Sequence, residues 1–197
     1  MARIDTPSGR YYEVNGHQLR SVTTILGKHF DIKPDTEEDA ERWAQLAERG
    51  SRIHALIANP PQVKAEYDAL PQSDRHGIDA AQRFKDGYGF RLEDAELQLA
   101  SVPLGYAGTV DAVGRIPKGR VILDWKTGQL RPNYVRLQLG AYYGLYTATY
   151  PRRFIYGAMG VQLNVTNGSY AVAAWSVLEL SQAFLEFIDI KGEVESE

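Results

Sequence analysis

The chain has 197 residues, which favours a single domain with one hydrophobic core. It has no cysteine, which excludes disulfides, thiolate-bound zinc and cysteine-bound iron–sulfur clusters. The net charge is −3. No apolar run reaches the roughly 18 residues of a membrane-spanning helix, and no leader segment opens the chain. We therefore expect a cytoplasmic protein of a bacterium or a phage-infected cell, with no membrane partner.

Residues 1–90 are expected to form an N-terminal hairpin followed by helices. Asn15-Gly16 between two alternating runs predicts a hairpin over residues 10–20, and a short helix should follow over 21–27. Asp35 and Glu38 have the spacing of a capping box, which predicts a helix from there to about residue 58. Two shorter helices are expected at 62–70 and 73–88. The long helix should bury an apolar stripe made of Trp43, Leu46, Ala47, Gly50, Ile53, His54 and Ile57.

Residues 91–190 should form the core sheet and its helices. Strands are predicted at 91–102, 105–115, 120–126, 154–161 and 169–175, with helices at 131–150 and 177–190. Residues 191–197 form an acidic tail, in which we expect residues 193–197 to be disordered. The predicted fold class is therefore α/β, with a mixed sheet of about five strands flanked by helices and an N-terminal helical section.

Two acids and a lysine stand at the ends of apolar strands. A turn at Pro117 that closes the hairpin places Asp111 opposite Asp124, unless a bulge shifts the register. Strand side chains alternate, so Lys126 should point to the same side as Asp124, and Trp125 to the other. Two close carboxylates repel unless a cation lies between them, and oxygen ligands suit Mg²⁺ or Mn²⁺. The Trp125 backbone carbonyl is a further candidate ligand. The alternative is an ordinary hairpin with a cross-strand Asp–Lys pair.

The charge around this hairpin is locally positive. Residues 105–160 contain eight arginines and lysines and two acids, although the whole chain carries −3. Such a surface fits a polyanionic substrate, and the alternative is a mixed, solvated surface.

These motifs resemble the PD-(D/E)xK nuclease superfamily, and most closely its RecB-type branch, which includes CRISPR-associated RecB-like nucleases and phage exonucleases. The matching segments are Gly50-x-x-x-His54, Gly108-x-x-Asp111, Asp124-Trp-Lys126-Thr-Gly and Gln138-x-x-x-Tyr142, with Trp125 where the branch usually has tyrosine. The resemblance implies a restriction-endonuclease-like core over one nuclease domain. It also implies His54, Asp111 and Asp124 as metal ligands, Lys126 as the catalytic lysine, Gln138 and Tyr142 facing the substrate, and Glu96 helping to position metal or water. The alternatives are a core histidine at position 54, a polar helix flank at Gln138 and Tyr142, and Glu93 in place of Glu96 or a surface carboxylate at both.

The leading hypothesis is a Mg²⁺- or Mn²⁺-dependent deoxyribonuclease, most simply a RecB-like exonuclease in DNA recombination or repair, with DNA and a recombination protein as partners. Two alternatives stay open. One is a DNA-binding accessory protein with an inactive site, and the other is a structure-specific endonuclease.

Overall fold

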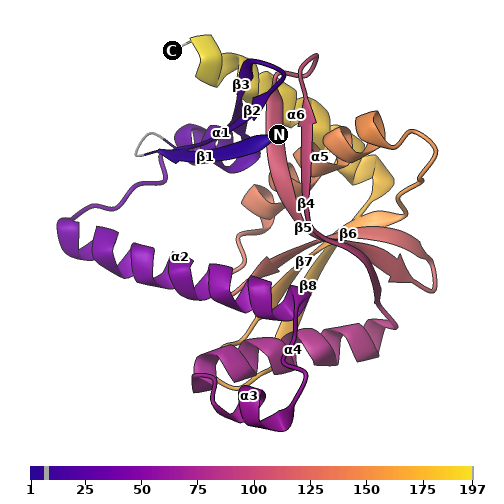
Figure 1. The fold of residues 1–197 in the computed structure, drawn as a ribbon. Helices are drawn as coiled ribbons and strands as arrows, with labels where there is room; N and C mark the ends of the chain where they lie inside the picture. Colours follow the sequence, from indigo (N-terminus) through magenta and orange to yellow (C-terminus); the bar gives the residue numbers. More distant parts are fainter. Residues whose placement is uncertain (7–8, 197) are drawn as a thin grey trace.

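A computed structural model describes residues 1–6 and 9–196 (Figure 1). Over these residues, the chain is an α/β protein built on one mixed sheet of eight strands with helices on both faces. The strands are β1 (Ala2–Thr6), β2 (Gly9–Val14), β3 (His17–Ser21), β4 (Arg91–Ser101), β5 (Tyr106–Ile116), β6 (Gly119–Lys126), β7 (Gly157–Leu163) and β8 (Tyr170–Ser176). The helices are α1 (Val22–His29), α2 (Glu37–Ala58), α3 (Lys64–Asp68), α4 (Gln72–Tyr88), α5 (Pro132–Thr149) and α6 (Val177–Ser196).

Strand β5 is the branching point of the sheet. One edge of β5 pairs along its length with β4. The other edge pairs antiparallel with β6 over residues 112–116 and parallel with β3 at Tyr106 and Ala107. Parallel pairing of β6 with β7 and antiparallel pairing of β7 with β8 complete the sheet. The second edge of β5 therefore forks, and residues 108–111 lie at the fork.

The expected count of about five strands is too low. Strands β4 to β8 correspond to the five predicted strands, and β2 and β3 to the predicted N-terminal hairpin. The hairpin does not stand apart, because β3 joins β5, and β1 adds a further strand that the sequence pattern did not indicate. Three N-terminal strands thus extend the sheet beyond the predicted core.

Among the described residues, the two larger of three apolar clusters lie on the two faces of the sheet. One cluster joins α1, α5 and α6 to β5 and β6, through residues such as Ile122 and Tyr146. The other cluster joins α4 and the last turns of α2 to β6 and β7, through residues such as Phe84 and Leu123. Neighbouring residues Ile122 and Leu123 enter different clusters because side chains of a strand alternate. By the same alternation, Asp124 lies on the side of α5.

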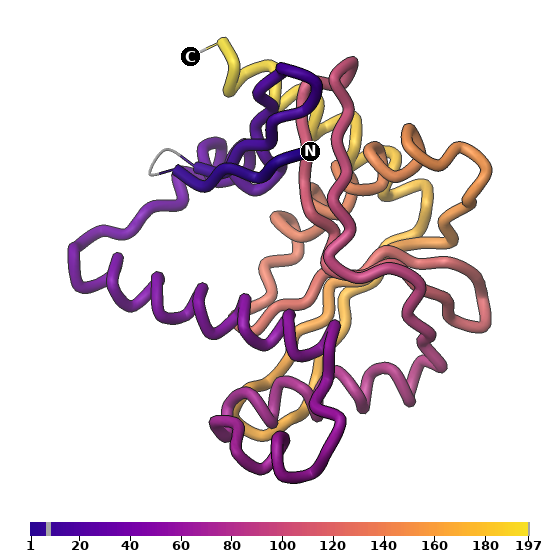
Figure 2. Tube along the Cα trace, viewed as in Figure 1, coloured from indigo at the N-terminus to yellow at the C-terminus, as the bar shows by residue number. Residues whose placement is uncertain are grey.

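Helix α2 begins one residue later than predicted. Thr36, and not Asp35, is the N-cap, and its side-chain oxygen accepts a hydrogen bond from the Asp39 backbone N–H at 3.1 Å. The prediction of one continuous buried stripe is also wrong. Ile53 and Ile57 are buried, whereas Trp43 is 36% and Leu46 is 44% exposed. Figure 2 shows the reason: the chain leaves α1, and the first turns of α2 start far from the sheet before the helix runs back to it.

The predicted disorder of the acidic tail is wrong for the described residues. Helix α6 continues to Ser196, Val194 is only 4% exposed, and Lys191 forms an ion pair with Glu195 at 2.7 Å. One buried valine and one pair four residues apart keep the last turns helical. Within residues 1–6 and 9–196, no helix has the length and apolar character needed to cross a membrane.

Candidate metal centre

The hairpin formed by β5 and β6 has the predicted register. Its ladder runs from Ile116 opposite Gly119 to Ala112 opposite Leu123, and the next residues along the two strands are Asp111 and Asp124. Beyond the ladder, Oδ2 of Asp111 accepts a hydrogen bond from the Trp125 backbone N–H at 2.8 Å. This bond ties the Asp111 carboxylate to β6.

Three potential ligands converge beside this hairpin. A nitrogen of His54 and carboxylate oxygens of Glu96 and Asp111 lie within 4.8 Å of one another. Nδ1 of His54 is 3.6 Å from Oδ1 of Asp111. Ligands about 2.0–2.2 Å from a common ion lie at most about 4.4 Å apart, so a small side-chain adjustment would let all three reach one cation. An imidazole with two carboxylates is a donor set that suits a divalent metal.

Glu96 has an unusual backbone that brings it into this group. Its neighbours Ala95 and Leu97 pair with Ala112 and Val110, so Glu96 stands opposite Asp111. Its φ angle is +49°, in the left-handed region that glutamate rarely adopts. Strained residues of this kind are common at functional sites, where the surrounding structure holds them in place.

A second polar group adjoins the triad. Lys126 Nζ lies 2.7 Å from Oδ2 of Asp124, which is 1% exposed, and donates a hydrogen bond to Oε1 of Gln138 at 3.0 Å. Nε2 of Gln138 in turn donates to the Tyr142 hydroxyl at 3.1 Å. The residues expected at the site from β6 and α5 thus form one chain of contacts. Among the described residues, Oδ2 of Asp124 has the Lys126 ion pair but no well-directed hydrogen bond.

The structure therefore divides the expected metal ligands into two groups. His54 and Asp111 are grouped with Glu96, whereas Asp124 pairs with Lys126 in the same pocket. The Trp125 ring is buried on the opposite face, with its ring centroid 5.5 Å from that of Phe84. Trp125 contributes its backbone N–H to the site, and its carbonyl remains a prediction as a ligand.

The electrostatics of the site follow from this crowding. Burial raises the pKa of Asp124 to about 6, although Lys126 lowers it. Burial would also raise the pKa of Asp111, but His54 and Lys126 outweigh it and lower that pKa. For Glu96, burial and the neighbouring Asp111 carboxylate raise the pKa. Protein cations thus compensate part of the carboxylate charge, and a bound metal ion would compensate more of it.

Two glycines explain how the elements come close enough. A Cβ on Gly50 would lie 3.2 Å from the Thr127 hydroxyl, so glycine lets α2 approach the end of β6, with His54 one turn further on. A Cβ on Gly108 would lie 2.6 Å from Cε1 of Tyr142. Because Gly108 has no side chain, the Tyr142 ring can lie against β5.

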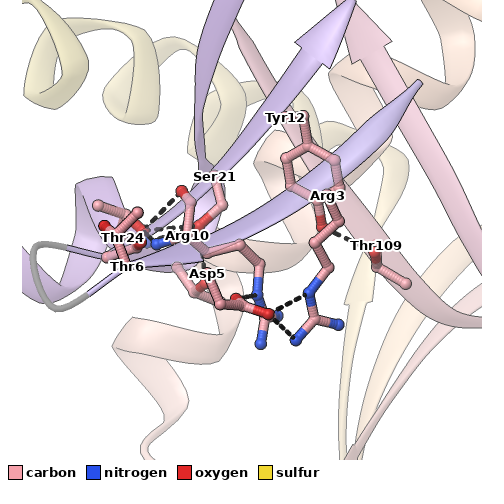
Figure 3. A network of polar contacts seen from close by, with 10 residues as sticks. Arg3, Asp5, Thr6, Arg10, Tyr12, Ser21, Thr24 and Thr109 are labelled. Atoms are coloured by element: carbon pink, nitrogen blue, oxygen red, sulfur yellow. Dashed lines mark hydrogen bonds and ion pairs between the residues drawn. The ribbon is translucent and has the colours of Figure 1, made fainter.

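The pocket above these residues has a volume of about 520 Å³ and includes two arginines that sequence reasoning missed. Arg3 on β1 and Arg10 on β2 both bind Asp5, with their Nε atoms 2.9 and 2.8 Å from its carboxylate oxygens (Figure 3). On the same side, the Tyr12 hydroxyl and Thr109 are hydrogen-bonded at 2.7 Å. No local sequence motif marks these arginines. Strands β1 and β2 reach the site only because they are joined to β3, which pairs with β5.

Comparison with known proteins adds information on the fold. No protein-family model matches the chain, and no curated protein matches it. Among solved structures, the chain is similar to the one titled "Crystal structure of SSO0001", at 14% sequence identity and a TM-score of 0.50, over 93% of this chain and 78% of that one. This likeness supports an α/β architecture shared over nearly the whole chain.

Proposed function

We propose that this protein is a metal-dependent deoxyribonuclease with a PD-(D/E)xK-type core, acting as a RecB-like exonuclease in recombination or repair. The observation that supports this most is the convergence of His54, Glu96 and Asp111 beside the Asp124–Lys126 pair in one pocket. Phosphodiester hydrolysis needs both parts: ligands for a cation and a fixed positive charge near the phosphate.

Each residue has a role that follows from its contacts. His54, Glu96 and Asp111 would hold Mg²⁺ or Mn²⁺, with Asp124 as a further candidate ligand. A divalent cation there would lower the pKa of the attacking water. Lys126, held by Asp124 and Gln138, would bind the scissile phosphate and stabilise the charge that develops on its oxygens. Tyr142 keeps Gln138 in place.

The test is cleavage of end-labelled linear DNA and of circular DNA with Mg²⁺, with Mn²⁺ or with EDTA. We expect metal-dependent release of nucleotides from linear DNA, and Asp111→Asn should abolish both cleavage and Mn²⁺ binding in calorimetry. Unchanged Mn²⁺ affinity in this variant would remove Asp111 from the metal site. Cutting of circular DNA would favour the endonuclease alternative.

Lys126 separates a working nuclease from an accessory protein with an inactive site. Lys126→Ala should reduce turnover by about 10²-fold, the effect of losing one preorganised donor, while metal binding persists. Lys118→Ala is the matched control, because Lys118 lies in the turn at the far end of the same hairpin and should leave turnover unchanged. Near-wild-type single-turnover cleavage by Lys126→Ala would contradict the assignment. A wild-type protein that binds DNA and metal but cuts nothing would favour the accessory role.

A further inference from the structure

The first three turns of α2 form an unpartnered helix with an apolar side. Every residue from Glu37 to Glu48 is exposed except Asp39, which is partly buried. Trp43 and Leu46 are 36% and 44% exposed, although large apolar side chains of an amphipathic helix normally face a core. The structure therefore leaves more than a third of an aromatic and of an aliphatic side chain open to solvent.

This apolar side leads directly to the candidate metal centre. Trp43, Ala47, Gly50 and His54 recur at intervals of three and four residues, so they share one face of the helix. Ala47, Gly50 and His54 line the metal pocket, and Leu46 also lines it. Trp43 lies one turn further out on the face that ends at the proposed ligand His54.

The charges near this face are arranged for an anion that lies along it. Glu41 and Glu48 are two residues away from Trp43 and Gly50 respectively, which places them on the opposite side of the helix. Asp39 lies one turn before Trp43 on the same face, and its carboxylate is paired with Arg42 at 3.0 Å. Arg3 on β1 and Arg10 on β2 line the same pocket and form its basic wall. Because these two guanidiniums share the single carboxylate of Asp5, the wall keeps a net positive charge.

We propose that the outer half of α2 and the Arg3–Arg10 wall form a binding site for single-stranded DNA, in which Trp43 stacks on a base and the arginines contact the backbone. The inference rests on the proposed function and names its substrate class. An aromatic platform opposite a basic wall is the usual way in which proteins hold single strands without reading sequence. The pocket volume of about 520 Å³ lies in the range of small-molecule sites, which is large enough for one nucleotide of a strand. Trp43 can stack only on a base that is free of its partner strand, so the site favours a single strand over an intact duplex.

The experiment measures binding of a fluorescent dT oligonucleotide of about 12 nucleotides by anisotropy, in EDTA so that nothing is cut. Trp43→Ala should weaken binding by roughly 5- to 150-fold, the range expected for loss of one stacked base, and Trp43→Phe should retain most of the affinity. Phe154→Ala is the matched control: this aromatic is 85% exposed and does not line the metal pocket, so its removal should leave binding unchanged.

A salt titration tests the arginine wall independently of stacking. Arg3→Ala should reduce the slope of log affinity against log salt by about 0.7, the value for one phosphate contact of a single strand, whereas Trp43→Ala should leave the slope unchanged. A blunt duplex of the same length should bind more weakly than the oligonucleotide and should not respond to Trp43→Ala.

Several outcomes would overturn the inference. Wild-type affinity of Trp43→Ala would do so, and so would equal weakening of duplex and single-strand binding. Sedimentation that shows a dimer dissociated by Trp43→Ala would assign the face to a second copy of the chain instead. The two proposals can fail separately. Trp43-dependent strand binding by a wild-type protein that never cleaves DNA would refute the nuclease alone, and normal cleavage of single strands by Trp43→Ala would refute the strand site alone.

Discussion

Gly108 offers a direct test of how β5 and α5 build the site, through the substitution Gly108→Ala. The new Cβ would lie 2.6 Å from Cε1 of Tyr142 and 3.3 Å from Cγ2 of Val22, whereas carbon atoms in contact prefer about 3.5–4.0 Å. The Tyr142 ring, which is 3% exposed, would have to move by roughly 1 Å.

Overpacking of this size costs about 2 kcal/mol, within the usual range of 1–3 kcal/mol for an added methyl in a packed core. For a domain of this length, the melting temperature should fall by about 4–8 °C. The movement should also reach the site, because the Tyr142 hydroxyl holds Gln138, which in turn accepts the hydrogen bond from Lys126. If the proposed nuclease function holds, turnover should fall by more than the lost stability explains at a temperature where the variant is fully folded.

Denaturant unfolding of Gly108→Ala gives the stability change, and Gly27 provides a matched control. A Cβ on Gly27 would meet no atom within 4 Å. Gly27→Ala, which lies within α1, should be neutral or stabilising by up to about 1 kcal/mol. In a Tyr142→Ala background, Gly108→Ala should lower the free energy of unfolding much less, because the ring that the new Cβ would overlap is absent. A Gly108→Ala protein within about 0.5 kcal/mol of wild type, or a double variant whose effects simply add, would refute this packing argument.

Three further variants test other parts of the structure. Arg52→Ala should destabilise the protein by about 2 kcal/mol in denaturant unfolding, because the fully buried Asp74 would lose its two hydrogen bonds to the guanidinium. Unchanged stability would show that water replaces these hydrogen bonds. Glu96→Gln should weaken Mn²⁺ binding in calorimetry and Glu93→Gln should not, because Glu93 is already paired with arginines on β5 and β6; equal effects would argue against the triad. Truncation after residue 192 should lower the melting temperature by removing Val194 from the core, and an unchanged value would show that the last turn contributes nothing.

The parts of the site that sequence predicted are those governed by short-range geometry. The register of the β5–β6 hairpin follows from one turn and the alternation of strand side chains, so Asp111, Asp124 and Lys126 could be brought together without knowledge of the fold. Gln138 and Tyr142 lie four residues apart on one helix and share a face for an equally local reason. Errors in such segments are small, such as the one-residue shift of the α2 cap from Asp35 to Thr36.

The parts that sequence missed depend on contacts between distant segments. Periodicity identified the apolar side of α2, but it cannot tell whether another element covers that side, and here Trp43 and Leu46 are left exposed. Nothing local to β1 and β2 shows that β3 pairs with β5, so Arg3 and Arg10 could not be assigned to the pocket.

The glycines of the site show why spacing alone carries so much information about this fold. Gly50 permits the close approach of α2 to Thr127, and one helical turn later His54 reaches Asp111. Gly108 leaves room for a ring from α5, and three residues later the same strand supplies Asp111. In both segments a missing side chain sets the distance between two elements, and a candidate ligand follows at the spacing that the helix or strand then requires. Glu96 has no such marker in the sequence, because its left-handed backbone would normally be signalled by a glycine and here belongs to a glutamate. Only the pairing of β4 with β5 shows that Glu96 stands opposite Asp111. The third candidate ligand is therefore the one whose position depends most on tertiary structure and least on local pattern.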